Sequence, residues 1–411
     1  MTLTNVLQSD LNPFAPEIRD DPYPRYRALR DAAPVAQAAP GVWLLTRFGD
    51  CETVLNDPRF GHLEPGEEPS NPMFGRLGDG IEPLCEPDGT PVNAFITLNP
   101  PAHTRVRGLL SGAFTVRRVQ QLEPRIAEIV DGLLDTALES GKFDLLSTVC
   151  YPLSVTVISE LLGVPPGDYP VFCEWTEHIC AGLDPALMNQ EGARERMRRA
   201  REEFAGYFLA LARERRGKPG HDLLSAMANA KAGADRLTDV ELVVTSTLLL
   251  IAGHETTANY LANSVLALLR NPAELERLAS QPVVTPGEAD ELLRYDPPGQ
   301  LASRVARVDT ELGGVPIAKG DSVLPLLGAA NRDPERYADP DRLDLTRPNV
   351  KHLAFGHGIH LCLGAQLART ETRIALRRLI DRAPGMAVVG ELRWKPHASL
   401  RGMQEFPLVT A

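Results

Sequence analysis

The chain lacks an excess of positive charge. Its 411 residues include 43 Lys and Arg against 54 Asp and Glu, which gives a formal net charge of −11 at pH 7. Proteins that bind nucleic acid neutralise its phosphates with clustered Lys and Arg, so the acidic balance argues against nucleic acid as a partner. The composition is otherwise typical of a globular protein with ample material for a core, with 43% hydrophobic and 24% charged residues.

Long apolar runs are also missing. Residues 1–10 contain no basic region followed by an apolar stretch, as a signal peptide would. The longest apolar run, 242–253, is interrupted by Thr245, Ser246 and Thr247 and is shorter than the about 20 residues that span a bilayer. We therefore expect a soluble, cytoplasmic protein that does not enter a membrane, and we expect it to be a monomer.

Several catalytic and metal motifs are absent. The six cysteines include no C-x-x-C pair, so we expect reduced thiols, most of them buried as small hydrophobic side chains. The absence of C-x-x-C-H excludes covalently attached c-type haem, and the absence of G-x-S-x-G excludes the nucleophile elbow of α/β hydrolases. His254-Glu255 begins like the zinc motif H-E-x-x-H, but Ala258 occupies the place of the second histidine.

Helical periodicity dominates what is present. The pattern lacks the repeated alternation of strands and helices that builds a parallel sheet. We expect a single domain over 1–411 that is mainly α with a minor β part. Its predicted helical core covers 102–296 and 364–382, and its β-rich parts lie near 35–60, 305–327 and 385–411.

The longest predicted helix begins after Thr238, where Glu241 completes a capping box. It continues to Arg270 and ends before Pro272. At 1.5 Å per residue it would be about 50 Å long, enough to cross the whole molecule.

Residues 61–101 show no regular pattern. They are rich in Pro, Gly, Glu, Asp and Asn, with isolated apolar residues such as Met73, Phe74 and Phe95. An irregular loop of about 40 residues is uncommon in a compact domain. The apolar residues favour a lid that packs over a pocket, and a disordered insert is the alternative.

Two stretches carry the strongest chemical signals. Cys362 lies between glycines at the start of a predicted helix, where the helix dipole and free N–H groups favour a thiolate. Such a thiolate is either a nucleophile or a metal ligand. In the middle of the long helix, Gly253 costs about 1 kcal/mol relative to alanine, and Glu255 and Thr256 need partners if they are buried. A solvent-facing polar turn is the alternative for this second stretch.

Two further pairs are weak when taken alone. Glu291 and Arg294 are three residues apart on one helix face, a spacing that usually makes a surface ion pair. His103 and Arg107 are four apart and could bind an anionic group. Taken alone, this second pair is better explained by a solvated helix face.

Taken together and in this order, the four features resemble the cytochrome P-450 monooxygenases. The stretch Phe355-x-x-Gly358-x-His360-x-Cys362-x-Gly364 matches the haem-ligand signature of that family. The other landmarks are Glu291-x-x-Arg294, Ala252-Gly-x-Glu-Thr-Thr257, Pro340-Asp-Arg342 and His103-x-x-x-Arg107. The resemblance extends from Asp21 to the C-terminal tail, is closest to the soluble bacterial type, and implies a haem between the long central helix and the helix that follows the cysteine.

The resemblance assigns roles around haem b. Cys362 would be the axial thiolate on the iron, donating electron density, while Phe355 would shield the sulfur and Gly364 would permit close approach of N–H groups. Gly356 and Gly358 would provide the tight bend of the loop. The two haem propionates would be held by His103, Arg107, Arg304 and His360.

The resemblance also assigns catalytic, structural and substrate residues. Glu255 and Thr256 would be the catalytic acid–alcohol pair that delivers protons to the dioxygen chemistry, and His254 would be only their helix neighbour. Glu291, Arg294 and Arg342 would form a buried structural network. A mostly apolar substrate pocket would be lined by Phe95, Leu248, Ile251, Ala252, Gln300, Leu301 and Met403.

The implied reaction is the insertion of one atom of O2 into an apolar small molecule such as a terpenoid, steroid, fatty acid or polyketide. No flavin or nicotinamide motif is present, so NAD(P)H-derived electrons would arrive through a ferredoxin and its reductase. A basic patch for the ferredoxin is expected at Arg105, Arg117, Arg369, Arg373 and Arg377. Two alternatives stay open: a peroxide-driven peroxygenase, whose known examples usually lack the acid–alcohol pair, and a non-catalytic haem sensor or carrier.

Overall fold

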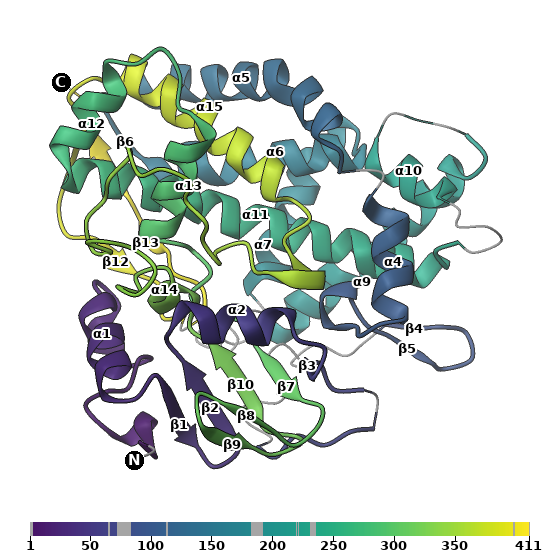
Figure 1. The fold of residues 1–411 in the computed structure, drawn as a ribbon. Helices are drawn as coiled ribbons and strands as arrows, with labels where there is room; N and C mark the ends of the chain where they lie inside the picture. The colour runs from purple at the N-terminus through teal and green to yellow at the C-terminus, as the bar shows by residue number, and fades with distance from the viewer. Residues whose placement is uncertain are drawn as a thin grey trace.

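Helix α11 (Asp239–Arg270) runs through the middle of the molecule (Figure 1). The computed structural model describes residues 3–64, 66–71, 84–111, 114–181, 192–218, 220, 222–230, 236–397 and 399–410. The hydroxyl oxygen of Thr238 accepts a hydrogen bond from the N–H of Glu241, and the Glu241 carboxylate accepts one from the N–H of Thr238, so the predicted capping box and both ends of the helix are confirmed.

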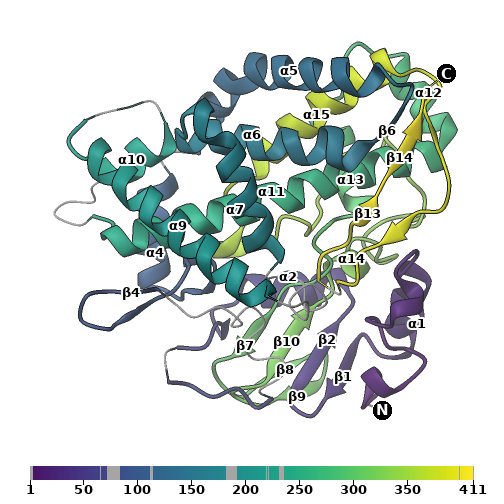
Figure 2. The same cartoon turned by 180° about the vertical axis from the view of Figure 1, so that it is seen from behind.

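Helices pack around α11 on several sides. Those in direct contact are α6 (Tyr151–Leu162), α7 (Tyr169–Ala181), α9 (Ala193–Arg215), α10 (Leu223–Asn229), α12 (Pro272–Ala279), α13 (Pro286–Tyr295) and α15 (Ala365–Arg382). Helix α5 (Val116–Leu138) covers α15 and α6, and α4 (Ala102–Ser111) stands beside α9 and α11 in both views (Figures 1 and 2). The helical bundle agrees with the predicted helical core.

Two apolar clusters hold this bundle together. One joins α5, α11 and α15 through side chains such as Leu134, Val265 and Leu376, which are fully buried. The other joins α7, α9 and α11 through Phe172, Phe204 and Leu250. Because burial of one large aliphatic or aromatic side chain contributes roughly 1.5–3 kcal/mol, these clusters fix the position of α11 relative to the helices on both sides.

A five-stranded sheet forms the lower part of the molecule in Figure 1. Its strand order is β1 (Val35–Ala39), β2 (Val42–Leu45), β10 (Ser322–Pro325), β7 (Arg304–Ala306) and β3 (Phe60–Gly61). Strands β2 and β10 are parallel, with Val42 paired to Ser322, and the other pairs are antiparallel. The hairpin of β8 (Thr310–Leu312) and β9 (Val315–Ile317) adjoins the sheet.

Short helices cover the sheet. They are α1 (Tyr23–Ala32), α2 (Phe48–Asn56) and α14 (Leu327–Ala330). Helix α2 packs Val54 and Leu55 against Leu45 and Val323 of the sheet and lies next to the cysteine loop. The prediction of a β-rich part over 35–60 is therefore only partly right, since α2 occupies its second half.

Smaller strands and turns complete the chain. In the C-terminal β part, β14 (Pro407–Val409) lies between β11 (Ala387–Val388) and β6 (Lys142–Asp144) and pairs with both. Strand β12 (Arg393–Trp394) pairs with β13 (Met403–Glu405). Strands β4 (Leu84–Cys85) and β5 (Pro91–Val92) form a separate hairpin. Single helical turns are η1 (Val6–Gln8), η2 (Pro16–Ile18), η3 (Phe95–Thr97), η4 (Leu146–Cys150), η5 (Pro166–Asp168) and η6 (Gly358–His360).

Two sequence-based expectations concern the periphery of the molecule. The predicted lid over 61–99 depends partly on Met73 and Phe74, which lie outside the described residues. Phe95, at the other end of that segment, is buried in the same apolar cluster as Leu250. Across the part of the chain that the structure describes, no helix is both long and apolar enough to cross a membrane.

Candidate active site

The cysteine loop connects η6 to α15 and is closed by its own backbone. The N–H of Cys362 donates to the carbonyl of Phe355 at 2.8 Å. Gly356 and Gly358 adopt φ values of 71° and 67°, so the predicted tight bend at these glycines is confirmed. A Cβ at Gly358 would lie only 2.6 Å from the carbonyl oxygen of Leu55, which means that glycine allows the loop to rest directly on α2.

The Cys362 thiol fits a metal ligand better than a free nucleophile. The side chain is open to solvent on one side, yet the surrounding protein limits its hydration and raises its pKa. The N–H of Gly364 and the guanidinium groups of Arg107 and Arg369 oppose this rise and favour the thiolate. A bound metal ion deprotonates a coordinating thiol outright, whereas a raised pKa leaves a free thiol protonated at neutral pH.

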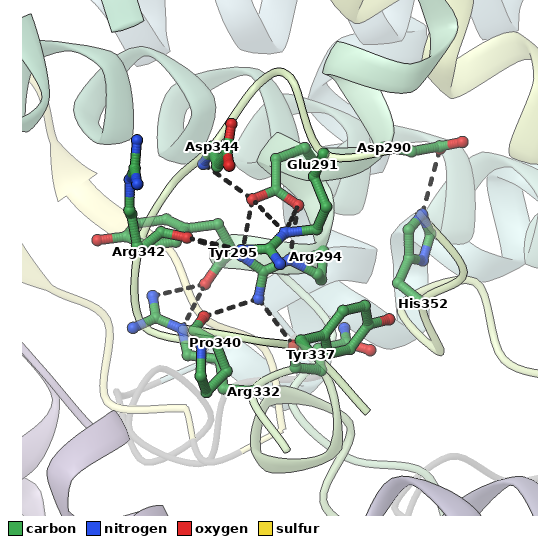
Figure 3. Close-up of polar contacts among 12 residues, drawn as sticks. Asp290, Glu291, Arg294, Tyr295, Arg332, Tyr337, Pro340, Arg342, Asp344 and His352 are labelled. Atoms are coloured by element: carbon green, nitrogen blue, oxygen red, sulfur yellow. Dashed lines mark hydrogen bonds and ion pairs between the residues drawn. The ribbon is translucent and has the colours of Figure 1, made fainter. Parts of the chain in front are cut away.

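The ring of Phe355 contacts two polar side chains, Arg369 and His352. The guanidinium of Arg369 stacks 4.5 Å from the centre of its ring, and the His352 ring lies 5.5 Å away. Both partners bond to Asp290 of α13: Arg369 Nε lies 2.6 Å from its carboxylate, and His352 Nε2 lies 3.2 Å from it (Figure 3). Burial works to raise the pKa of Asp290, but these two partners hold it below its ordinary value, so a charged carboxylate links α13, α15 and the loop.

The four predicted propionate ligands come together on the other side of the cysteine loop. The rings of His103 and His360 are 4.4 Å apart, and Arg107 donates to the carbonyl of Leu361 at 2.5 Å. Burial, followed by the charges of Arg304, His62, His103 and Arg107, lowers the pKa of His360 to about 2. Burial alone lowers the pKa of Arg304 to about 10.

This cluster of bases lacks acidic partners among the described residues. Both ring nitrogens of His103 and Nδ1 of His360 are buried there without a hydrogen-bond partner. Buried polar groups are normally satisfied, and each positive charge here disfavours the next. The cluster therefore suits a ligand with two carboxylates placed beside Cys362, and a haem, with its two propionates and its iron, has this donor and charge requirement.

Glu255 and Thr256, the polar residues in the middle of α11, have different partners. Thr256 donates its hydroxyl hydrogen to the carbonyl of Ala252, one turn earlier in the helix, at 2.5 Å. Glu255 is 6% exposed and pairs with the ammonium of Lys395. Lys395 also donates to the hydroxyl of Tyr151 at 2.7 Å. Although burial lowers the pKa of Lys395, Tyr151 and Glu255 raise it above its ordinary value, so the lysine is positively charged.

His254 lies beside this ion pair. Its Nδ1 is 3.1 Å from the hydroxyl of Ser154, and its ring centre is 5.1 Å from that of Tyr151. Burial and the charge of Lys395 lower the pKa of His254 to about 4. The imidazole is therefore neutral at physiological pH.

Glu291 and Arg294, at the centre of the predicted network, have fully buried side chains, and Figure 3 shows their contacts. Arg294 binds Glu291 through two hydrogen bonds of 2.6 and 2.8 Å. Its other N–H groups donate to the carbonyls of Asn331, Pro340 and Arg342. Asn331 in turn accepts a hydrogen bond from the N–H of Leu353, which leads into the cysteine loop.

The expected part of Arg342 in this network needs correction. Arg342 contributes its carbonyl oxygen, while its side chain is exposed and points away (Figure 3). The second guanidinium near Glu291 belongs instead to Arg347, at 3.4 Å. No sequence pattern pointed to Arg347 or Asn331, because both lie in an irregular Asp-, Pro- and Arg-rich segment.

Three of the predicted pocket residues share one environment. Phe95, Leu248 and Ile251 all pack in the cluster between α7, α9 and α11, and Ala252 next to them is exposed. Leu248 and Ile251 lie on the same helix as Thr256, and Phe95 of η3 packs in the same apolar cluster.

The other predicted pocket residues pack inside the protein, and their place in a substrate pocket stays a prediction. Gln300 is 3% exposed and bonds to Tyr26 and Pro297, and Leu301 packs against the N-terminal cluster. Met403 is completely buried in the core with α5 and α15. These three side chains are therefore used in internal packing.

The expected basic patch is also largely internal. Arg369 is held by Asp290, Arg373 donates to the carbonyl of Val284, and Arg377 donates to the carbonyls of Leu278 and Gln281. Arg105 pairs with Glu241. Of the five predicted arginines, Arg117 alone is exposed, so the helix face that the sequence suggested is not a free basic surface.

Comparison with known proteins shows the family. A family model described as Cytochrome P450 matches residues 176–281 and 289–382. The cytochrome P450 monooxygenase PikC of Streptomyces venezuelae is 39% identical over 97% of this chain and 93% of its own length. The chain therefore belongs to the cytochrome P450 family, and it is a monooxygenase of bacterial type.

Two further matches extend over nearly the whole chain. The vitamin D(3) 25-hydroxylase of Pseudonocardia autotrophica is 38% identical over 99% of this chain and 98% of its own length. The crystal structure of P450BioI in complex with hexadec-9Z-enoic acid ligated acyl carrier protein is 34% identical, with a TM-score of 0.83, and covers 96% of this chain and 100% of that chain. The predicted fold, mainly α with a minor β part, is thus confirmed, and membership of the family implies a haem iron cofactor.

Proposed function

We propose that this monooxygenase hydroxylates or epoxidises an apolar small molecule, with haem b held by Cys362 and with electrons from NAD(P)H delivered by separate proteins. The observation that supports it most directly is a solvent-open cysteine beside a group of buried bases that have no acidic partner in the described part of the chain. Haem bound through a thiolate supplies the activation of dioxygen.

The residues around Cys362 have distinct parts in this proposal. The N–H of Gly364 and the charge of Arg369 would favour the thiolate, and Phe355 would keep water from one side of the sulfur. The haem carboxylates would be held by His103, Arg107, Arg304 and His360.

Proton delivery is assigned to α11. Because Thr256 donates its own hydrogen to the carbonyl of Ala252, its oxygen lone pairs are free to accept a hydrogen bond from a water molecule. Glu255, the next residue, would pass protons from the interior ion pair with Lys395 towards Thr256. This acid–alcohol pair also argues against a peroxide-driven enzyme and against a passive haem carrier, since neither needs a proton relay.

The substrate is proposed to be apolar and of some size. Phe95, Leu248 and Ile251 supply apolar surface next to Ala252. The names of two relatives refer to vitamin D(3) and to a hexadecenoic acid linked to acyl carrier protein. A terpenoid, steroid, fatty acid or polyketide agrees with both observations.

A ferredoxin and a ferredoxin reductase are proposed as the electron donors, because the sequence contains no flavin or nicotinamide motif. The partner, the monomeric state and the cytoplasmic location stay predictions. Reduction of the purified enzyme by candidate ferredoxins, followed by stopped-flow absorbance, would identify a productive donor.

The decisive experiment is the absorption spectrum of the reduced protein with carbon monoxide. A thiolate ligand gives a strongly red-shifted Soret band, and Cys362→Ser should abolish it. A globin-like band in the unaltered protein would overturn the proposal. Compounds that convert the bound haem from low to high spin would then identify the substrate class.

A further inference from the structure

We propose that His62 is an additional ligand of the haem carboxylates, placed by the sheet as a third imidazole beside His103 and His360. The inference depends on the haem site proposed above and adds a residue from a segment that carries no motif. Its geometry, its unsatisfied ring nitrogen and its fixed backbone support it independently.

The register of the sheet places His62 at the site. In the antiparallel pair of β3 and β7, Phe60 opposes Ala306 and Gly61 opposes Val305. The next step of this register brings His62 opposite Arg304, one of the expected carboxylate ligands. The His62 ring lies edge-on to that of His360, with ring centres 5.0 Å apart.

The backbone of His62 is clamped by Asn99. The N–H of His62 donates to Asn99 Oδ1 at 2.9 Å, and Asn99 Nδ2 donates to the carbonyl of His62 at 2.8 Å. The carbonyl of Asn99 accepts the N–H of His103 at 2.9 Å. A Cβ at Gly61 would come within 2.5 Å of Asn99 Oδ1, so glycine is needed for this approach. Asn99 therefore fixes His62 relative to the first turn of α4, which carries His103.

The imidazole of His62 has an unused polar atom. Its Nε2 is buried and has no hydrogen-bond partner among the residues that the structure describes. Burial, followed by the charges of Arg304 and His103, lowers its pKa to about 4. A buried N–H without an acceptor is costly, and the addition of an anion at this point would satisfy it.

Arg307, a neighbouring cation, differs from the bases around His360 because it has an acidic partner. Arg307 also contacts His62, donating to its carbonyl at 2.6 Å. Its charge, however, is balanced by Glu67 at 3.0 Å. The bases that remain unbalanced, His62 and Arg304 among them, are those grouped around His360. A dicarboxylate ligand would complete this group.

The test compares His62→Phe, which removes the ring nitrogens, with His62→Gln, whose side-chain amide can replace the Nε2–H donor. Haem loss is measured by transfer to excess apomyoglobin, and the reduction potential by dye-coupled titration. We expect haem loss from His62→Phe to be about tenfold faster, as for a lost hydrogen bond to a charged group, with a changed potential. His62→Gln should stay close to the unaltered protein.

His357→Phe is the matched control, because His357 lies in the cysteine loop but is 43% exposed in its side chain. It should change neither quantity. Equal haem loss from His62→Phe and His62→Gln, whether fast or slow, would show packing alone and overturn the inference. If His62→Phe holds no haem, retention by His62→Gln still supports it. The red-shifted carbon monoxide band of the unaltered protein, measured first, separates failure of this inference from failure of the haem-thiolate assignment.

Discussion

The ammonium of Lys395 pairs with the carboxylate of Glu255, although the two residues belong to the C-terminal β part and the central helix. The pair is largely buried, with side-chain exposures of 19% and 8%. The proposed proton donor of α11 is therefore held by a residue from the other end of the sequence, and its behaviour should depend on that residue.

Lys395→Met should impair proton delivery without preventing substrate binding. Removal of the counter-charge leaves Glu255 buried beside Tyr151 without its cation, so we expect turnover to fall about tenfold and more NAD(P)H to be lost as peroxide. The measurement is product and peroxide formed per NAD(P)H, with the substrate-induced spin shift as the binding control. Thr256→Ala should give the same uncoupling, and Lys395→Arg should restore much of the yield. If Lys395→Met formed as much product per NAD(P)H as the unaltered protein, Lys395 would have no role in proton delivery.

Glu291→Ala should yield little haem-loaded protein. Removal of one partner of a buried ion pair leaves an uncompensated charge and costs roughly 3–5 kcal/mol, and Arg294 here also anchors the segment that leads to Leu353. The ratio of Soret to protein absorbance gives the haem content. Arg342→Ala is the matched control and should load normally, because its side chain is exposed. Normal haem content in Glu291→Ala would contradict the role of the network.

Asp290→Asn should weaken the thiolate side of the site. The carboxylate of Asp290 holds both Arg369 and His352 against Phe355, so its neutralisation should loosen the cysteine loop. We expect the red-shifted carbon monoxide band to decay several-fold faster at moderate temperature. Asp381→Asn is the control. Asp381 also pairs with an arginine of α15, Arg377, but its side chain is 54% exposed. If the carbon monoxide band decayed at the same rate in both variants, Asp290 would not stabilise the cysteine loop.

His254 should make the protein acid-sensitive. Its pKa is about 4 in the folded state and about 6.5 in an unfolded chain. The unfolded state therefore binds the proton first as pH falls, so stability is constant above pH 6.5 and decreases towards pH 4. Given the partial exposure of the ring, we expect a loss of about 2 kcal/mol. Thermal unfolding midpoints from pH 4.5 to 7.5 should fall less steeply for His254→Asn, and identical pH profiles would contradict this assignment.

The sequence predicted those parts of the fold that depend on local pattern. The ends of α11 followed from a capping box and an apolar repeat, both readable within a few residues of Thr238 and Arg270. The bend at Gly356 and Gly358 followed from the motif around Cys362. The correction at Arg342 concerns the direction of a side chain, which tertiary packing sets.

The site residues that the sequence did not reveal are single polar side chains in irregular segments. His62, Arg347 and Lys395 lack a periodic or motif context, and their contacts exist only because strands and turns from distant parts of the chain meet.

The parallel pairing of β2 with β10 joins Val42 to Ser322 and has a consequence for biosynthesis. The proposed carboxylate ligands come from the residue that follows β3, from α4, from β7 and from the cysteine loop, so they cannot assemble until the chain has been synthesised beyond His360. Contacts of such long sequence separation form late in folding. Nascent chains truncated before Cys362 should therefore capture no haem, and cofactor insertion should follow synthesis rather than accompany it.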